Sequence, residues 1–186
     1  RDHRGLVPVP ESHLDLWAEA LERRTRRLAE RGVRYVFAVA PDKESIYGDR
    51  LPGWMRPLGP TTLDRLAARL AGSAVEFVDL RPRLLDEKRH DAPGDWCYFA
   101  GGTHWSPRGA WAAAQVLLER LRADFPAIAP DERAAYLRPP LPPEREDSLS
   151  PRLLTGRLLD VPQADFVPAG GFRAPATGIS QQARDD

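Results

Sequence analysis

The residues best suited to chemistry lie in one stretch, residues 98–110. A short apolar run there ends in two glycines, His104 and Trp105 follow, and then a helix is expected to begin. Ser106 is a typical N-cap residue, and Pro107 suits the first helical position. His104 is therefore expected between the carboxyl end of a strand and the amino end of a helix, where ligands bind in open α/β sheets. Because a neutral imidazole can take a proton from a hydroxyl, we predict that His104 is a catalytic base.

A catalytic histidine of this kind needs a nucleophile, and the serines provide no convincing one. Ser12 and Ser106 are expected to cap helices, and Ser45 follows the first strand without a recognisable nucleophile turn. The G-x-S-x-G motif does not occur in the sequence. The remaining serines, which lack a suitable strand–turn–helix setting, are Ser73, Ser148, Ser150 and Ser180.

Candidates for substrate binding follow the first expected strand. Asp42, Lys43 and Tyr47 lie in a loop at the carboxyl end of that strand, the functional edge of such sheets. Turn formation by Asp42 and packing of Tyr47 under the loop are the alternative explanation. Trp105 is the tryptophan that we predict to stack on a substrate, whereas loop and core packing account for the others.

Neither a metal site nor a cofactor site is expected. His3, His13, His90 and His104 lack the spacing of metal-binding helices, and a single cysteine, Cys97, makes no zinc site. The glycines fit neither a phosphate loop nor a dinucleotide fingerprint.

Strands and helices are expected to alternate, which is typical of a mostly parallel sheet with helices on both faces. Residues 1–137 are expected to form this α/β domain, and residues 138–186 a proline-rich irregular extension with a short helix at 153–159. A polar loop is expected at 86–94, and Trp17 is expected in the buried stripe of the first helix. In order, the elements are helix 12–31, strand 35–40, helix 62–71, strand 75–80, a short helix at 84–85, strand 96–100 and helix 107–123.

Composition limits the range of partners. The chain has 186 residues, and its 27 basic side chains balance its 27 acidic ones. This neutral balance gives no electrostatic reason to expect nucleic acid or an anionic membrane as a partner. No apolar run reaches the roughly 20 residues that span a bilayer.

Two blocks of the sequence resemble one known family. Residues 36–43 with Ile46-Tyr47 and Leu51-Pro52 resemble its "apolar strand, P-N-K, I-Y, L-P" block, with Asp42 in place of the usual Asn. Residues 98–110 resemble its "Y…D-T-H-W…G-A" block. The family is the alginate O-acetyltransferase (AlgJ/AlgX) type of SGNH-hydrolase-like protein.

The resemblance implies an SGNH-hydrolase-like, flavodoxin-like α/β fold and an activity. Members acetylate hydroxyls of exported polysaccharides on the extracytoplasmic side by a Ser/His mechanism, without a cofactor. The implied partners are the polysaccharide and an acetyl donor such as a membrane acetyl-transfer protein, and the implied location is the periplasm, with an N-terminal segment as membrane anchor.

The sequence departs from the family pattern in two places. Gly102 stands where the family has the aspartate that orients the histidine, so a dyad or another carboxylate, such as Asp95 or Asp42, would have to serve. The serine strand of the family should follow the region of Gly156, and the chain ends at Asp186. We therefore expect a sheet that is incomplete at the C-terminus and a chain that is inactive, or nearly so, when tested alone. The alternatives are a non-catalytic carbohydrate-binding or assembly module and a carbohydrate acetyl esterase.

Overall fold

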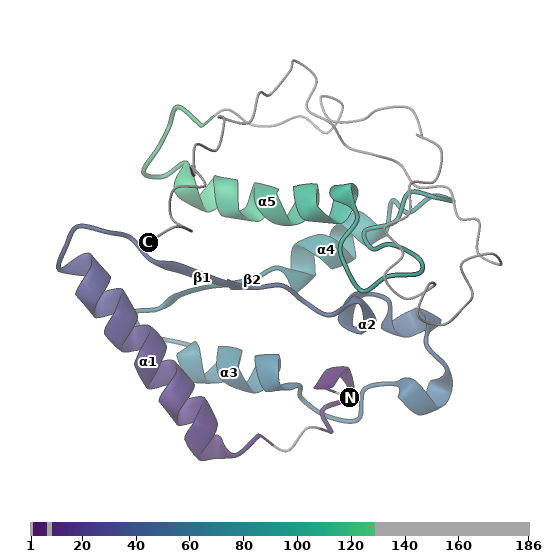
Figure 1. The fold of residues 1–186 in the computed structure, drawn as a ribbon, viewed down its shortest axis with the longest axis horizontal. Coiled ribbons are helices and arrows are strands. Elements are labelled where there is room, and N and C mark those ends of the chain that lie inside the picture. Colours follow the sequence, from purple (N-terminus) through teal and green to yellow (C-terminus); the bar gives the residue numbers. More distant parts are fainter. Residues whose placement is uncertain (1, 7–8, 129–186) are drawn as a thin grey trace, which may run out of the picture.

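A computed structural model describes residues 2–6 and 9–128 of the chain. Its centre is a parallel pair of strands, β1 (Val36–Val39) and β2 (Glu76–Asp79), in which Val36 pairs with Glu76 and Val39 with Asp79 (Figure 1). The α-helices are α1 (Glu11–Ala29), α2 (Lys43–Ile46), α3 (Thr62–Leu70), α4 (Arg81–Lys88) and α5 (Pro107–Leu121). Short 3-10 turns are η1 (Asp2–Arg4), η2 (Gly48–Arg50) and η3 (Gly53–Met55).

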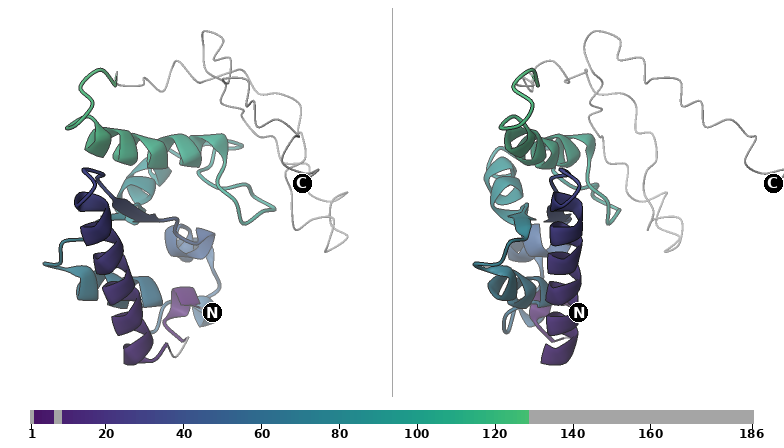
Figure 2. Two further views of the ribbon diagram at one scale, coloured as in Figure 1. Left: turned by 60° about the vertical axis from the view of Figure 1, so that its left-hand side comes forward. Right: turned by 90° about the vertical axis from the view of Figure 1, so that its left-hand side faces the viewer.

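Helices cover both faces of the strand pair, as the sequence predicts. Helices α1 and α3 lie on one face and α4 and α5 on the other, and the turned views keep this order of layers (Figures 1 and 2). Side chains alternate along β1, so that Ala38 packs into the α4–α5 core and Phe37 into the α1–α3 core. Both faces of the strand are thus covered, which explains its nearly continuous apolar run. The chain is an α/β domain.

Local signals at the helix ends explain most of the boundaries. Ser106 caps α5 as predicted, because its side chain accepts a hydrogen bond from the Gly109 amide. Thr61 and Asp64 form a reciprocal capping box at the start of α3. The prediction that Ser12 caps the first helix is wrong: the helix begins at Glu11, after Pro10, and has no side-chain cap.

Two further expectations within the described part of the chain are wrong. Trp17 is 48% exposed and lies beside the buried stripe, which Leu14 and Leu21 form with Ala18. Helix α4 continues to Lys88, through the first residues of the polar loop predicted at 86–94, so the loop begins later.

The strand predicted at residues 96–100 does not form, because other groups bind its backbone. Only an isolated bridge between Tyr98 and Trp105 is present. The carbonyls of residues 95–97 accept hydrogen bonds from the Arg108 guanidinium, the Ser106 hydroxyl and the Ser106 amide. Since backbone polar groups require a partner but not a strand partner, an apolar run can remain a loop here.

None of the described helices is long and apolar enough to cross a bilayer. The predicted extension 138–186 and its short helix at 153–159 lie outside the described residues, as does the predicted domain boundary at 137/138.

Candidate active site

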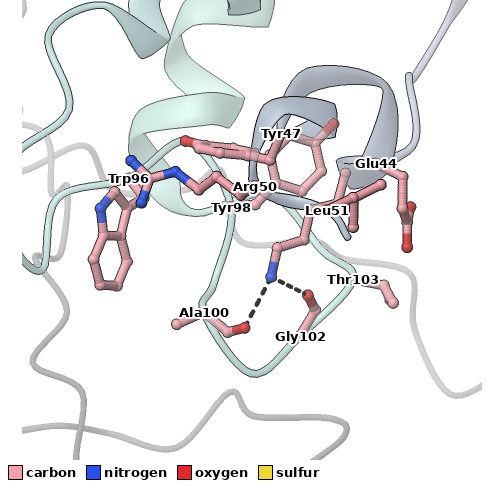
Figure 3. Close-up of a pocket in the computed structure, with 10 residues that line it drawn as sticks. Glu44, Tyr47, Arg50, Leu51, Trp96, Tyr98, Ala100, Gly102 and Thr103 are labelled. Atoms are coloured by element: carbon pink, nitrogen blue, oxygen red, sulfur yellow. Dashed lines mark hydrogen bonds between the residues drawn. The ribbon is translucent and has the colours of Figure 1, made fainter. Parts of the chain in front are cut away.

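A cavity of about 380 Å³ lies beyond the carboxyl end of β1. One wall comes from α2, η2 and Leu51, and the other from the loop between α4 and α5 (Figure 3). Carbon atoms dominate its lining, as in typical ligand pockets. The lining residues are Lys43, Glu44, Tyr47, Arg50, Leu51, Trp96, Tyr98, Ala100, Gly102 and Thr103.

Lys43, a predicted substrate-binding residue, lines this cavity, but its ammonium forms hydrogen bonds to backbone carbonyls of the protein. Its Nζ donates to the carbonyl oxygens of Phe99 at 2.7 Å, Ala100 at 2.8 Å and Gly102 at 3.2 Å. Figure 3 shows the hydrogen bonds to Ala100 and Gly102 as dashed lines. Lys43 thus connects the start of α2, which follows β1, to the loop that carries His104.

Tyr47, also predicted to bind substrate, is buried and forms the floor of the site. Its hydroxyl accepts a hydrogen bond from the Cys97 amide at 3.0 Å. The Lys88 ammonium lies 4.9 Å and the Arg50 guanidinium 5.8 Å from the ring centre. Burial raises the pKa of the Tyr47 hydroxyl far above its usual value, so the phenol stays neutral at physiological pH.

Trp105, another predicted substrate-binding residue, contacts Tyr98, which lines the cavity. Its Nε1 donates to the Tyr98 hydroxyl at 2.5 Å, and that hydroxyl donates to the carbonyl oxygen of Pro41 at 2.6 Å. Burial raises the pKa of Tyr98 well above its usual value. The indole is partly exposed and does not line the cavity itself.

Neither His104 nor Asp42 lines the cavity, but each directly adjoins a residue that does, Thr103 and Lys43 respectively. His104 is exposed and follows Gly102 and Thr103, which both line the cavity. Its carbonyl oxygen accepts a bond from the Phe99 amide at 3.2 Å, whereas its imidazole makes no hydrogen bond to any described residue. Asp42 is exposed at the residue before α2, and its carbonyl oxygen accepts a bond from the Ser45 amide.

Asp95, one of the two proposed substitutes for the orienting carboxylate, belongs to a buried charge cluster instead. At its centre is Arg108, a residue that the sequence analysis missed and that is fully buried. The guanidinium donates to the Glu87 carboxylate at 2.8 Å and to the Asp91 carboxylate at 3.0 Å. It also donates to the carbonyls of Glu87 at 2.5 Å and Asp95 at 2.6 Å, and the Asp95 carboxylate lies 3.8 Å away.

The described serines supply no nucleophile in contact with His104. Ser106 donates to the Trp96 carbonyl while it caps α5, and Ser73 accepts from the Val75 amide. Ser148, Ser150 and Ser180, which the sequence does not favour as nucleophiles, lie outside the described residues. Within the part of the chain that the structure describes, no cluster of side chains could hold a metal ion.

The sequence analysis missed several lining residues. Glu44 and Arg50 belong to the same short segment as Lys43 and Tyr47. Their closeness in sequence to these two residues was the only sign that they line the cavity. Trp96 and Tyr98 were assigned to a strand, which hid their role in the cavity wall. Thr103 lies beside His104 and offered no separate signal.

The parallel strands, the helices on both faces and the cavity at the carboxyl edge define an SGNH-hydrolase-like α/β domain. The family model described as "SGNH hydrolase-like domain, acetyltransferase AlgX" matches residues 5–174, so the chain belongs to this family. Its predicted family and fold class are thereby confirmed.

Two solved structures are similar to this chain. One is PatB1 from Bacillus cereus, with a TM-score of 0.57 and 17% identity over 88% of this chain and 54% of that chain. The other is the O-acetyltransferase domain of AlgJ from Pseudomonas putida, with a TM-score of 0.49 and 22% identity over 80% and 56% of the two chains. The chain thus spans little more than half the length of either structure. No curated protein matches the sequence as a relative.

Proposed function

We propose that this domain takes part in transferring acetyl groups to the hydroxyls of an exported polysaccharide, outside the cytoplasm. The observation that carries the proposal is the position of His104, on a loop whose preceding residues line a cavity at the carboxyl edge of the sheet. The cavity volume of about 380 Å³ falls within the range of small-molecule pockets and is large enough for an acetyl group together with a sugar ring.

In the proposed reaction, His104 serves as general base twice. It first takes the proton of a serine hydroxyl elsewhere in the gene product, and the serine oxygen attacks the acetyl carbonyl of the donor. The donor's leaving group departs with the proton from the imidazolium. A sugar hydroxyl then gives its proton to His104, and its oxygen attacks the acetyl-serine. The bond between the acetyl carbon and the serine oxygen breaks, the imidazolium returns the proton to that oxygen, and the sugar is left acetylated.

The other candidate residues have supporting roles in this proposal. We propose that Asp42 and Trp105 contact the sugar outside the cavity, whereas Tyr47 lines the cavity as a neutral phenol. The acetyl donor is proposed to be a membrane acetyl-transfer protein.

The test is acetyl transfer by the gene product that contains this chain. p-Nitrophenyl acetate serves as donor and a neutral oligosaccharide as acceptor, with acetylated sugar measured by mass spectrometry. His104→Ala should lower the rate by about 10²–10⁴-fold, the usual contribution of a general base. His13→Gln, on exposed α1, is the matched control and should leave the rate unchanged. Equal rates for wild type and His104→Ala would refute the proposed role.

A non-catalytic carbohydrate-binding module is the second candidate, because Gly102 stands where the family has its orienting carboxylate. Its carbonyl oxygen faces the Lys43 ammonium, so this position contributes a peptide group and no carboxylate. Saturable oligosaccharide binding without acetyl transfer would favour this module. Acetyl release to water without sugar acetylation would favour an esterase.

A further inference from the structure

Lys43 and the loop before His104 make an unusual contact. A lysine ammonium has three N–H donors, and the three backbone carbonyls around this one match that number. They belong to Phe99, Ala100 and Gly102, so they all come from a single four-residue turn. Lys43 itself is the first residue of α2, 56 to 59 residues earlier in the chain.

Without the ammonium, this arrangement of carbonyls would be unfavourable. Three oxygen atoms that converge on one point repel each other, and the hydrogen bonds to Phe99 and Gly102 are partly buried. The bond to Ala100 is exposed, so water would replace the cation only on that side. The turn has only two backbone hydrogen bonds of its own, from the Gly102 amide to the Phe99 carbonyl and from the Phe99 amide to the His104 carbonyl, each 3.2 Å long. Its two adjacent glycines also give the unrestrained chain a wide choice of conformations.

We infer that Lys43 is a positioning residue for His104, and that its ammonium holds the turn 99–102 in shape and does not bind substrate. The inference rests on the proposed function for the role of His104, but not for the contact itself. Because Ala100, Gly102 and Thr103 line the cavity, the same contact also fixes one cavity wall. The lysine sets the position of the backbone two residues before the imidazole.

The direct test is hydrogen exchange of individual amides, measured by NMR. Lys43→Met removes the charge and keeps most of the side-chain volume, and it should speed exchange at the Phe99 and Gly102 amides at least tenfold. The Ser106 amide, which bonds to the Cys97 carbonyl at 3.0 Å, is the internal reference and should change little. Glu44→Gln, the next residue along the same cavity, is the matched control and should leave all three amides unchanged. Unchanged exchange at Phe99 and Gly102 in Lys43→Met would overturn the inference.

A chemical rescue separates the need for the ammonium from a general loss of packing. In Lys43→Cys, alkylation with bromoethylamine rebuilds a side chain of lysine length that ends in an ammonium. The native Cys97 is fully buried, so under native conditions the reagent modifies the introduced thiol. Aminoethylation should restore slow exchange at Phe99 and Gly102, whereas alkylation with iodoacetamide, which adds a neutral amide, should not. Equal recovery with both reagents would show that filling the space is sufficient and would overturn the inference.

The two proposals fail in different ways. Fast exchange in Lys43→Met, together with no acetyl transfer by any form of the gene product, would support the role of Lys43 and refute the proposed function. Where transfer occurs, Lys43→Met should lower kcat with little change in KM for the sugar. A raised KM with unchanged loop exchange would instead identify Lys43 as a substrate contact and would refute the positioning role.

Discussion

Arg108 is the residue whose removal should damage the fold most. Its side chain is 1% exposed, and its carboxylate partners Glu87 and Asp91 are 6% and 8% exposed. Removing one member of such a buried pair leaves an unpaired charge inside the protein, which typically costs about 3–5 kcal/mol. Two backbone carbonyls, those of Glu87 and Asp95, would each lose one donor and keep only a backbone amide, from His90 and Ala92 respectively. We therefore expect Arg108→Met to lower the free energy of unfolding by about 4 kcal/mol.

The assay is urea unfolding followed by tryptophan fluorescence and circular dichroism, with coincident transitions as the check for two-state behaviour. Arg23→Met is the control, because Arg23 pairs with Glu19 on the surface of α1 and both side chains are more than half exposed. Such a pair contributes about 0–1 kcal/mol. The melting temperature of Arg108→Met should fall by roughly 10 °C, since about 1 kcal/mol shifts a domain of this size by 2–4 °C.

The pH dependence gives a second, independent signature of the same cluster. Burial already raises the pKa of the Asp91 carboxyl above its ordinary value, and the Arg108 charge opposes that rise. In Arg108→Met this opposition is lost, so between the unfolded and the folded pKa the native state binds more protons than the unfolded state. Stability then falls as pH rises through this window, and the deficit of the variant should shrink on acidification.

Two results would refute this account of Arg108. One is a deficit in Arg108→Met as small as that of Arg23→Met. The other is a deficit that stays constant or grows as the pH is lowered from neutral. The double variant Arg108→Met/Glu87→Gln should recover part of the loss, because it removes one of the two carboxylates left unpaired.

Two other predictions test the packing around Cys97. A Cβ at Gly109 would lie 2.1 Å from the Cys97 carbonyl oxygen, so Gly109→Ala should destabilise the protein by about 3 kcal/mol in urea unfolding. Gly48→Ala, where a Cβ meets no atom within 4 Å, is the control, and equal losses in the two variants would contradict the close approach. Burial raises the pKa of the Cys97 thiol to about 11, so at pH 8 it should react with a disulfide reagent only after unfolding in urea. Rapid stoichiometric labelling of the native protein would show that the Cys97 thiol is accessible and would contradict this prediction.

The sequence was sufficient to predict an element where local signals and the pattern of burial agree. The apolar run at 36–39 is covered on both faces, so its composition revealed a central strand, and Ser106 caps α5 through a contact three residues away. Such signals depend on neighbours in the chain and on the periodicity of buried side chains. The fold class followed from their alternation along the sequence.

The sequence was insufficient to predict a residue's role where its contacts are with distant segments of the chain. Lys43 was predicted to bind substrate at the carboxyl edge of the sheet. Its bonds to backbone carbonyls could not be predicted, because such bonds leave no trace in residue type. Arg108 appeared to be an ordinary residue in the first turn of a helix, because its partners Glu87 and Asp91 come from α4 and the following loop. Asp95 lies in the same cluster, and therefore its suitability as a partner for His104 could not be judged from spacing alone.

The same long-range contacts explain why the segment before His104 is a loop and not a strand. Arg108 binds the carbonyl of Asp95 at its beginning, and Lys43 binds the carbonyls of 99, 100 and 102 at its end. A strand in these positions would turn its carbonyls to a neighbouring strand, and both cations would lose their acceptors. Between the two anchors, Trp96 and Tyr98 turn toward the cavity (Figure 3). The two cations, together with Ser106 at the carbonyls of residues 96 and 97, therefore satisfy the carbonyls that a neighbouring strand would otherwise bind, and the segment can form the wall of the site.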